Sequence, residues 1–137
     1  MAGYDDRDGF IWMDGKLVDW RGANVHILTH ALHYASAVFE GERCYNGKIF
    51  KSTEHSERLR MSGELLDMSL PFTVEEINAA KEAVLKANNL TDAYVRAIAW
   101  RGTRGSGTWR RSSPAGCSMR RCERRCAGPR ARCWCWR

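Results

Sequence analysis

The chain has 137 residues and a formal net charge of +6, and 44% of its residues are hydrophobic. This length supports one domain with a modest core. No apolar run approaches the roughly 18 residues that a membrane helix needs, and the acidic, polar start MAGYDDRDGF does not resemble a signal peptide. These observations predict a cytoplasmic protein with no membrane partner.

Charge and cysteine content divide the chain near residue 102. Residues 1–102 hold 12 Lys+Arg and 15 Asp+Glu, whereas residues 103–137 hold 10 Arg, no Lys and a single acid, Glu123. Cys44 stands alone in the first part, as in a reduced intracellular protein. We therefore treat 1–102 as the domain and 103–137 as an Arg-, Cys- and Trp-rich tail.

Turn signals predict strands in the first half of the domain. Asp14-Gly15 lies between two short apolar runs and predicts a hairpin, because both central positions of a type I′ turn need positive φ. Its strands should lie near 9–13 and 16–20. After a loop or short strand, Thr29 could cap a helical turn that runs through Tyr34. A strand should follow over 37–45, then an Asn46-Gly47 turn and an antiparallel return over 48–51.

Helical periodicity dominates the second half. Ser52 and Thr53 offer an N-cap for an amphipathic helix over 53–68, and Pro71 should stop that helix. A second helix should start at a capping box and end near Asn88-Asn89, with one apolar stripe formed by Ile77, Ala80, Val84 and Leu85. Residues 93–100 should form a strand. The order predicts an α+β fold, with two helices on one face of a mainly antiparallel sheet and an irregular tail.

The segment from Val25 to Tyr45, VHILTHALHYASAVFEGERCY, mixes small residues with aromatic and polar ones. Such a mixture suggests a wall that a ligand or a second chain approaches closely. His26, His30 and His33 have a spacing that could mimic a metal site, but no HExxH pattern or clear carboxylate ligand accompanies them. We therefore expect these histidines to have packing or hydrogen-bonding roles and predict no metal.

The tail shows no apolar period after Thr103. A frame slip in GC-rich DNA would produce such Arg/Cys/Trp-rich text, so we interpret the tail as disordered or frame-shifted; an intact single frame through Arg137 would rule out a slip. Its cysteines match zinc spacing weakly. An Arg/Trp-rich tail could also bind nucleic acid, which would make the chain a non-catalytic binding module. Salt-dependent binding that vanishes on deleting 103–137 would favour that alternative, which we consider unlikely.

Three separated motifs resemble one known family over about residues 8–102. The stretches HALHYASAVFEGERCY, HSERL and NNLTDAYVRAIAWRG are similar to the N-terminal domain of branched-chain amino acid aminotransferases. These belong to the class IV group, which uses pyridoxal 5′-phosphate. D-amino acid aminotransferases and aminodeoxychorismate lyases share the architecture. The resemblance implies a homodimeric enzyme that transfers an amino group between Leu, Ile or Val and 2-oxoglutarate.

The resemblance also implies roles for individual residues. Arg58 matches the arginine that binds the cofactor phosphate, and a planar, always charged guanidinium suits a phosphate dianion. Tyr34 and Phe39 match residues that line the pocket for the substrate side chain, with Tyr34 acting from the neighbouring subunit. The alternatives are a helix-surface pair of Arg58 with Glu54 or Glu57, and plain aromatic core positions for Tyr34 and Phe39.

Tyr94 and Arg96 match the pair that receives a substrate carboxylate. Residues i and i+2 of a strand share one face, so both side chains can reach one pocket. A charged residue in the apolar run AYVRAIAW should have a partner; the alternative is a solvent-facing edge-strand arginine. We expect Arg58, Tyr94 and Arg96 to open onto one anion-binding cleft. Guanidinium groups on opposite sides of the domain would end the aminotransferase interpretation, whatever the motifs suggest.

The resemblance implies no catalytic residue in this chain. The family lysine that forms the Schiff base lies in a second domain, as does the glutamate that pairs with the pyridine nitrogen. None of the five lysines here matches it; they are Lys16, Lys48, Lys51, Lys81 and Lys86. We therefore expect a truncated aminotransferase that is inactive alone. Gly41 matches a position of close backbone approach, and Glu40 and Arg43 are assigned no role beyond a possible local pair.

Overall fold

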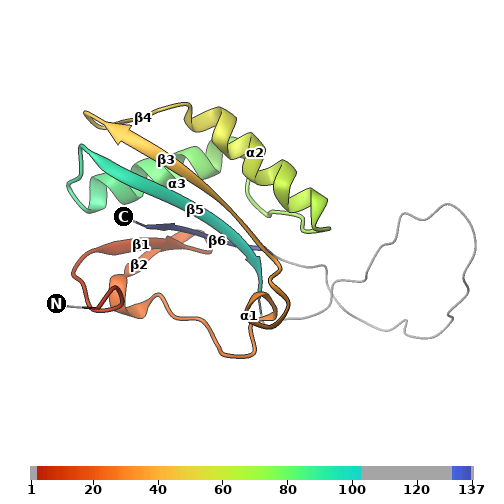
Figure 1. The fold of residues 1–137 in the computed structure, drawn as a ribbon. Coiled ribbons are helices and arrows are strands. Elements are labelled where there is room, and N and C mark those ends of the chain that lie inside the picture. Colours follow the sequence, from red (N-terminus) through yellow and green to blue (C-terminus); the bar gives the residue numbers. More distant parts are fainter. Residues whose placement is uncertain (1–2, 103–130, 137) are drawn as a thin grey trace, which may run out of the picture.

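The computed structural model describes residues 3–102 in full and residues 131–136 as a backbone strand. The strands form one six-stranded sheet in which every recorded pairing is antiparallel. From one edge to the other they are β2 (Lys16–Asp19), β1 (Phe10–Met13), β6 (Ala131–Trp136), β5 (Ala93–Arg101), β3 (Ala37–Tyr45) and β4 (Lys48–Ile49). Two long helices, α2 (Ser52–Leu65) and α3 (Val74–Ala87), lie on the same side of the sheet (Figure 1). The predicted α+β class is confirmed.

Both predicted hairpin turns form. At the first turn, Asp14 and Gly15 have φ of 51° and 96°, as a type I′ turn requires. At the second turn, Asn46 and Gly47 have φ of 49° and 76°. A short 3₁₀ helix, η1 (Trp20–Gly22), follows the first hairpin. The register pairs Ile11 with Val18 in the first hairpin and Cys44 with Ile49 in the second.

The predicted side-chain caps of the first two helices do not form, although Thr29 occupies the N-cap position of the first. Helix α1 (His30–Tyr34) begins after Thr29, but the Thr29 side chain makes no capping hydrogen bond. Helix α2 begins after Lys51, which has a left-handed backbone, and it ends at Leu65 instead of residue 68. The Ser52 hydroxyl instead donates to Asn78 Oδ1 on α3, at 3.0 Å. A long-range contact has therefore replaced a local cap.

Helix α3 follows its sequence signals closely. The Thr73 hydroxyl accepts from the Glu76 backbone N–H at 3.2 Å, and the Glu76 carboxylate accepts from the Thr73 N–H at 2.7 Å. This reciprocal capping box satisfies two donors that the helix start would otherwise leave unpaired. The predicted apolar stripe is buried and consists of Ile77, Ala80, Val84 and Leu85.

The core lies between the two helices and one face of the sheet. One cluster joins Leu59 of α2 and Ile77 of α3 to Ala97 and Ala99 of β5. A second cluster joins helix α3 to β3 and β5, and it comprises Cys44, Val84, Leu85, Ala93 and Val95. Because strand residues alternate between faces, the odd-numbered residues 93–99 of β5 define the helix-covered face and Tyr94 and Arg96 lie on the other.

Part of the tail is not irregular. Strand β6 pairs with β1, where Trp12 is opposite Cys135, and with β5, where Ala97 is opposite Cys135. Its backbone joins the N-terminal hairpin to the rest of the sheet (Figure 1). The sequence reasoning missed this strand because ARCWCW lacks the alternation of a half-buried strand. The remaining tail interpretations, including zinc and nucleic-acid binding, fall outside the described residues or on side chains of β6 that are not described.

Within the described ranges, no helix is both long enough and apolar enough to cross a membrane.

Candidate functional site

Strand β3 carries acidic side chains on its helix-covered face. Glu40 is opposite Ala97 of β5 in the register, and Ala97 belongs to the core, so Glu40 faces the helices. Glu42, two residues further, shares that face. Both acids are buried, at 5% and 2% exposure. Two buried carboxylates on one face need partners, because an unpaired buried charge is costly.

Glu40 receives its partners from helix α2. The Arg58 Nε donates to Glu40 Oε1 at 2.6 Å and Nη2 donates to Oε2 at 2.6 Å, which makes a two-pronged ion pair. His55 Nδ1 lies 2.8 Å from the same Oε2. The hydrogen bonds from Arg58, followed by that of His55, outweigh the effect of burial and hold the pKa of Glu40 below its ordinary value. The pairs considered from sequence, Arg58 with Glu54 or Glu57 and Glu40 with Arg43, are not those found.

Glu42 receives its partner from helix α3. The Lys81 ammonium donates to both Glu42 oxygens, at 2.8 and 3.1 Å, and also to the Ser52 carbonyl and the Ser56 hydroxyl. Lys81 is 1% exposed. The Ser56 hydroxyl in turn donates to Asn78 Oδ1 at 2.7 Å. Burial raises the pKa of Glu42, although the Lys81 hydrogen bond acts in the opposite direction. This network joins β3, α2 and α3.

The opposite face of the sheet carries an aromatic and arginine cluster. The Arg96 guanidinium carbon lies 4.3 Å from the centre of the Phe39 ring, and Arg96 Nη2 donates to Tyr94 Oη at 3.3 Å. Arg96 Nε is buried and has no hydrogen-bond partner among the described residues. Gly41 is opposite Arg96 in the register. A Cβ at position 41 would clash with Tyr94 Oη and lie 2.9 Å from Cζ, so glycine permits the predicted close approach.

The structure does not bring the three residues of the predicted cleft onto one face of the sheet. Arg58 binds Glu40 on the helix-covered face, whereas Tyr94 and Arg96 lie with Phe39 on the other face. The i, i+2 argument placed Tyr94 with Arg96 correctly, but it could not relate a helix residue to a strand face. By the criterion set from sequence, this separation would end the aminotransferase interpretation. The family comparison below shows that this criterion was too strict.

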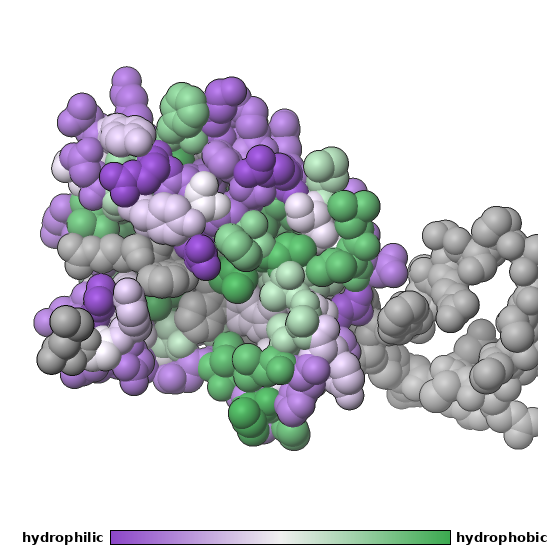
Figure 2. Space-filling view, viewed as in Figure 1, coloured by the Kyte–Doolittle hydropathy of each residue, from purple (hydrophilic) through white to green (hydrophobic). Residues whose placement is uncertain are grey.

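Tyr34 stands apart from both clusters. It lies at the end of α1, is 72% exposed and contacts the His30 ring, with ring centroids 4.5 Å apart. It is one of five exposed apolar or aromatic side chains that we call the 25–34 surface: Val25, Ile27, Leu28, Leu32 and Tyr34. Figure 2 shows hydrophobic side chains gathered below the sheet, at the place of α1 in Figure 1.

The three histidines of this segment make local hydrogen bonds. His30 Nδ1 lies 2.6 Å from the Ser36 hydroxyl, and His33 Nε2 lies 2.9 Å from the Ile27 carbonyl. His26 Nδ1 accepts from the Leu28 N–H at 3.1 Å. Across the part of the chain that the structure describes, no group of His, Cys, Asp or Glu could hold a metal ion. The histidines thus fold the segment upon itself.

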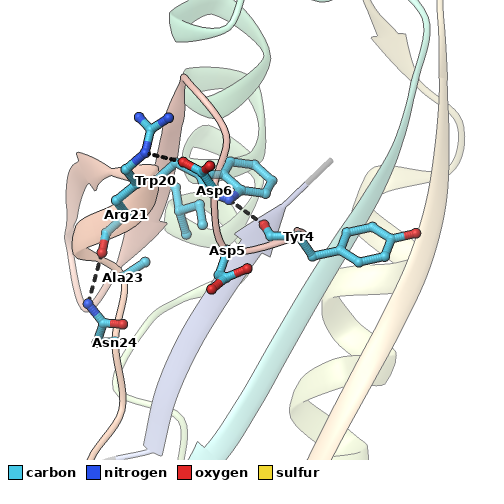
Figure 3. Close-up of a pocket in the computed structure, with 8 residues that line it drawn as sticks. Tyr4, Asp5, Asp6, Trp20, Arg21, Ala23 and Asn24 are labelled. Atoms are coloured by element: carbon cyan, nitrogen blue, oxygen red, sulfur yellow. Dashed lines mark hydrogen bonds and ion pairs between the residues drawn. The ribbon is translucent and has the colours of Figure 1, made fainter. Parts of the chain in front are cut away.

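A pocket of about 540 Å³ lies beside the N-terminal hairpin, away from the predicted site residues. Tyr4, Asp6, Trp20 and Arg21 are among the residues that line it. Figure 3 shows the Trp20 indole N–H donating to the Tyr4 carbonyl, at 2.6 Å, and Arg21 paired with Asp6, at 2.8 Å. Several of the polar groups that line the pocket therefore bind one another.

A family comparison decides what kind of protein this is. The model of the family described as "Amino-transferase class IV" matches residues 37–120. This range includes β3, both long helices and β5. The chain belongs to the class IV aminotransferases. The match includes the HSERL and AYVRAIAW segments, and it does not depend on a shared cleft.

Branched-chain members of the family are similar to this class IV aminotransferase chain. This chain is 52% identical over 92 residues to a probable branched-chain-amino-acid aminotransferase of Rickettsia felis, and the match covers 67% of this chain and 32% of that protein. The structure of the Escherichia coli branched-chain enzyme matches with a TM-score of 0.75 and 32% identity, over 94% of this chain and 39% of that one. The chain therefore spans about a third of the length of the curated relatives it matches.

Ligand complexes of a further branched-chain amino acid aminotransferase match equally well. One is its structure with N-(5′-phosphopyridoxyl)-L-glutamate, and another is its structure with 4-methylvaleric acid. Each has a TM-score of 0.73 and 30% identity, and each covers 95% of this chain and 41% of that one. A phosphopyridoxyl group and a branched carboxylic acid thus bind to a protein of this fold.

Sequence reasoning gave Glu40 no role beyond a possible pair with Arg43, and it did not consider Glu42 in this aminotransferase chain. Its only available signal was their i, i+2 spacing between Val38 and Cys44, which places two acids on the face of two apolar residues. Acids on an apolar face require cations from the elements that cover it. That rule would have directed attention to Arg58 and Lys81, but it would not have matched each acid to its partner.

Replacing Lys81 tests the buried network. Lys81→Met should lower the free energy of unfolding by about 3–5 kcal/mol, because it leaves Glu42 buried without its cation. Lys81→Met combined with Glu42→Leu should recover part of this loss. Lys86→Met is the matched control, since Lys86 is 81% exposed at its side chain and should change stability little. Urea unfolding of the full chain measures all three, and a double variant no more stable than Lys81→Met would contradict the account.

Removing the charge of Glu40 should change how stability depends on pH. The folded state lowers the pKa of Glu40, so the ion pair stabilises above the unfolded value of about 4.3 and is lost as the pH falls through the folded value. The difference in stability between the wild type and Glu40→Gln should therefore be largest above about pH 5 and should shrink towards pH 2. A difference that stays constant from pH 7 to pH 2, measured by urea unfolding, would refute this.

Proposed function

We propose that this chain provides the N-terminal domain of a branched-chain amino acid aminotransferase. The reaction would transfer an amino group between Leu, Ile or Val and 2-oxoglutarate with pyridoxal 5′-phosphate. The observation that carries the proposal is the cluster of Arg96, Tyr94 and Phe39 on the open face of the sheet. There an arginine whose buried Nε has no hydrogen-bond partner in the described part of the chain stands beside aromatic side chains.

The cluster suits a substrate with a carboxylate and an apolar side chain. The Arg96 guanidinium offers a planar fork of donors to a carboxylate. The Tyr94 hydroxyl, 3.3 Å from Arg96 Nη2, supplies a further donor at the same place. Phe39 is 56% exposed and offers an apolar surface to the substrate side chain. These residues would orient the substrate.

Arg58 fits the phosphate of the cofactor. Its Nε and Nη2 bind Glu40, while its Nη1 has no recorded partner among the described residues and the side chain is 58% exposed. A guanidinium in this state can donate further charge-assisted hydrogen bonds to a phosphate. When bound, pyridoxal phosphate supplies an electron sink for the carbon that loses its proton. We propose that Arg58 holds this cofactor only at its phosphate end.

One ligand could reach both faces of the sheet at the free edge of β3. The recorded pairing of β4 reaches only Cys44 and Tyr45. Among the described residues, positions 37–42 of β3 therefore have a strand neighbour on one side only, β5. Glu40, which holds Arg58, and Phe39, which stacks on Arg96, are consecutive residues at this edge. We propose that the cofactor and substrate lie across it, which reconciles the two faces with one active site.

The lysines of this chain are unsuited to forming the Schiff base. Such a lysine must be desolvated and free to react. Lys81 is buried, but its ammonium is fully engaged by Glu42, Ser52 and Ser56. The other four are exposed: Lys16, Lys48, Lys51 and Lys86. We propose that the 137 residues alone do not catalyse transamination.

The 25–34 surface supports the proposed homodimer. Its members are exposed and apolar, and Tyr34 lies among them. Contiguous exposed apolar side chains favour burial against another protein surface. We propose that this surface docks on a second subunit and that Tyr34 lines the partner's substrate pocket.

A domain-replacement experiment tests the proposed function. Residues 1–102 replace the matched segment of the E. coli enzyme, and transamination of leucine with 2-oxoglutarate is measured. The chimera should be active. Arg96→Met should lower kcat/KM for 2-oxoglutarate at least about 30-fold, because a carboxylate loses its charged partner, a cost of about 2 kcal/mol or more.

Arg43→Met is the matched control for this experiment. Arg43 lies on the same face of the sheet, opposite Tyr94 in the register, and stacks 5.5 Å from the Tyr45 ring. Its replacement should change kcat/KM less than threefold. An inactive but folded chimera, or equal losses from the Arg96 and Arg43 replacements, would contradict the proposal.

A further inference from the structure

We propose that Glu40 is a positioning residue, which holds Arg58 in the orientation that presents its remaining N–H groups to a phosphate monoester. This inference rests on the proposed function, which assigns the cofactor phosphate to Arg58. It adds a residue on the neighbouring strand that acts on the phosphate only through Arg58.

The geometry of the pair divides the donors of Arg58 into two sets. Nε and one N–H of Nη2 are committed to the two oxygens of Glu40, each at 2.6 Å. A guanidinium has five N–H groups in one plane, so three remain, two on Nη1 and one on Nη2. Because the plane is rigid, fixing two donors also fixes the direction of the other three.

Glu40 is the rigid partner and Arg58 the adaptable one. The Glu40 side chain is 6% exposed. It stands within strand β3, where the residues before and after it also pair with β5. The Arg58 side chain is 58% exposed on the outer part of α2. Without Glu40, the long arginine side chain would sample many rotamers, and binding a phosphate would then require ordering it.

His55 secures Glu40 in turn. A carboxylate only accepts hydrogen bonds, so the His55 Nδ1 that lies 2.8 Å from Oε2 must carry the proton and donate. The 3.3 Å approach of Arg58 Nη2 to the same Nδ1 is then a contact between two donors and adds no hydrogen bond. Glu40 is thus held by three donors from α2, two from Arg58 and one from His55.

Positioning and simple electrostatics predict opposite effects. Glu40 is negative and lies directly behind Arg58, so through its charge alone it repels a phosphate dianion. If charge were its only influence, neutralising Glu40 would strengthen phosphate binding. If Glu40 orients Arg58, neutralising it weakens phosphate binding despite the relief of repulsion.

The experiment measures binding to the full chain. The probes are pyridoxine 5′-phosphate, pyridoxine and inorganic phosphate, which lack an aldehyde and cannot react with lysines. Titrations followed by NMR compare the wild type, Glu40→Gln, Arg58→Lys and the double variant. Glu57→Gln is the matched control, because Glu57 is an exposed acid next to Arg58 on α2 and loses the same charge.

Glu40→Gln should weaken binding of pyridoxine 5′-phosphate and of inorganic phosphate at least about tenfold and leave pyridoxine binding unchanged, since pyridoxine has no phosphate. The same replacement in the Arg58→Lys background should have no further effect. Glu57→Gln should match the wild type. In the ligand-free wild type, the Arg58 Nε–H resonance should already be separated from those of exposed arginines. This measurement needs no variant, so it tests the role of Glu40 even if Glu40→Gln does not fold.

Three results would overturn only the role of Glu40. The first is phosphate binding by Glu40→Gln that is as tight as in the wild type or tighter, and the second is an equal loss of pyridoxine binding. The third is an Arg58 Nε–H signal averaged with those of exposed arginines. If the wild-type chain binds neither phosphate probe, or if Arg58→Lys binds them as tightly as the wild type, Arg58 is not the phosphate residue. Either result would overturn this inference together with that part of the proposed function.

Discussion

The structure depends on how two buried acids of one strand are neutralised. Glu40 and Glu42 face the helices from β3, and each takes a cation from a different helix: Arg58 from α2 and Lys81 from α3. Neither helix could move far along the sheet without leaving a buried carboxylate unpaired, which is among the costliest defects in a protein interior. The ion pairs therefore fix the helices at one register on the sheet, which apolar contacts alone specify less sharply.

The same arrangement gives the two faces of β3 different roles, one in stability and one in the proposed binding. Its helix-facing side chains hold the domain together, and its outward side chains leave an open surface with Phe39, Gly41 and the arginine cluster. Gly41 has no side chain, and this leaves room on the outward surface for the Tyr94 hydroxyl. One strand of nine residues thus anchors two helices and supports the surface where a carboxylate is proposed to bind.

Local chemistry made much of the fold predictable. Asp14-Gly15 and Asn46-Gly47 need positive φ, and Thr73 with Glu76 forms a reciprocal cap, so the hairpins and α3 followed from neighbouring residues. Tyr94 and Arg96 were placed together correctly by strand alternation. Glu42 and Lys81 are 39 residues apart, and nothing local signals that they meet. The placement of Arg58 and Arg96 on different faces was unpredictable for the same reason, since it required knowing which face of the sheet α2 covers.

The buried network also limits the chemistry of this chain. Lys81 is the one lysine of the five that is buried, yet Glu42 and its hydroxyl and carbonyl partners occupy its ammonium group. The most direct test is reduction with borohydride after mixing the purified chain with pyridoxal 5′-phosphate, followed by peptide mapping. The account predicts only scattered, substoichiometric adducts on exposed lysines. A single lysine modified at stoichiometric yield, Lys81 above all, would contradict it.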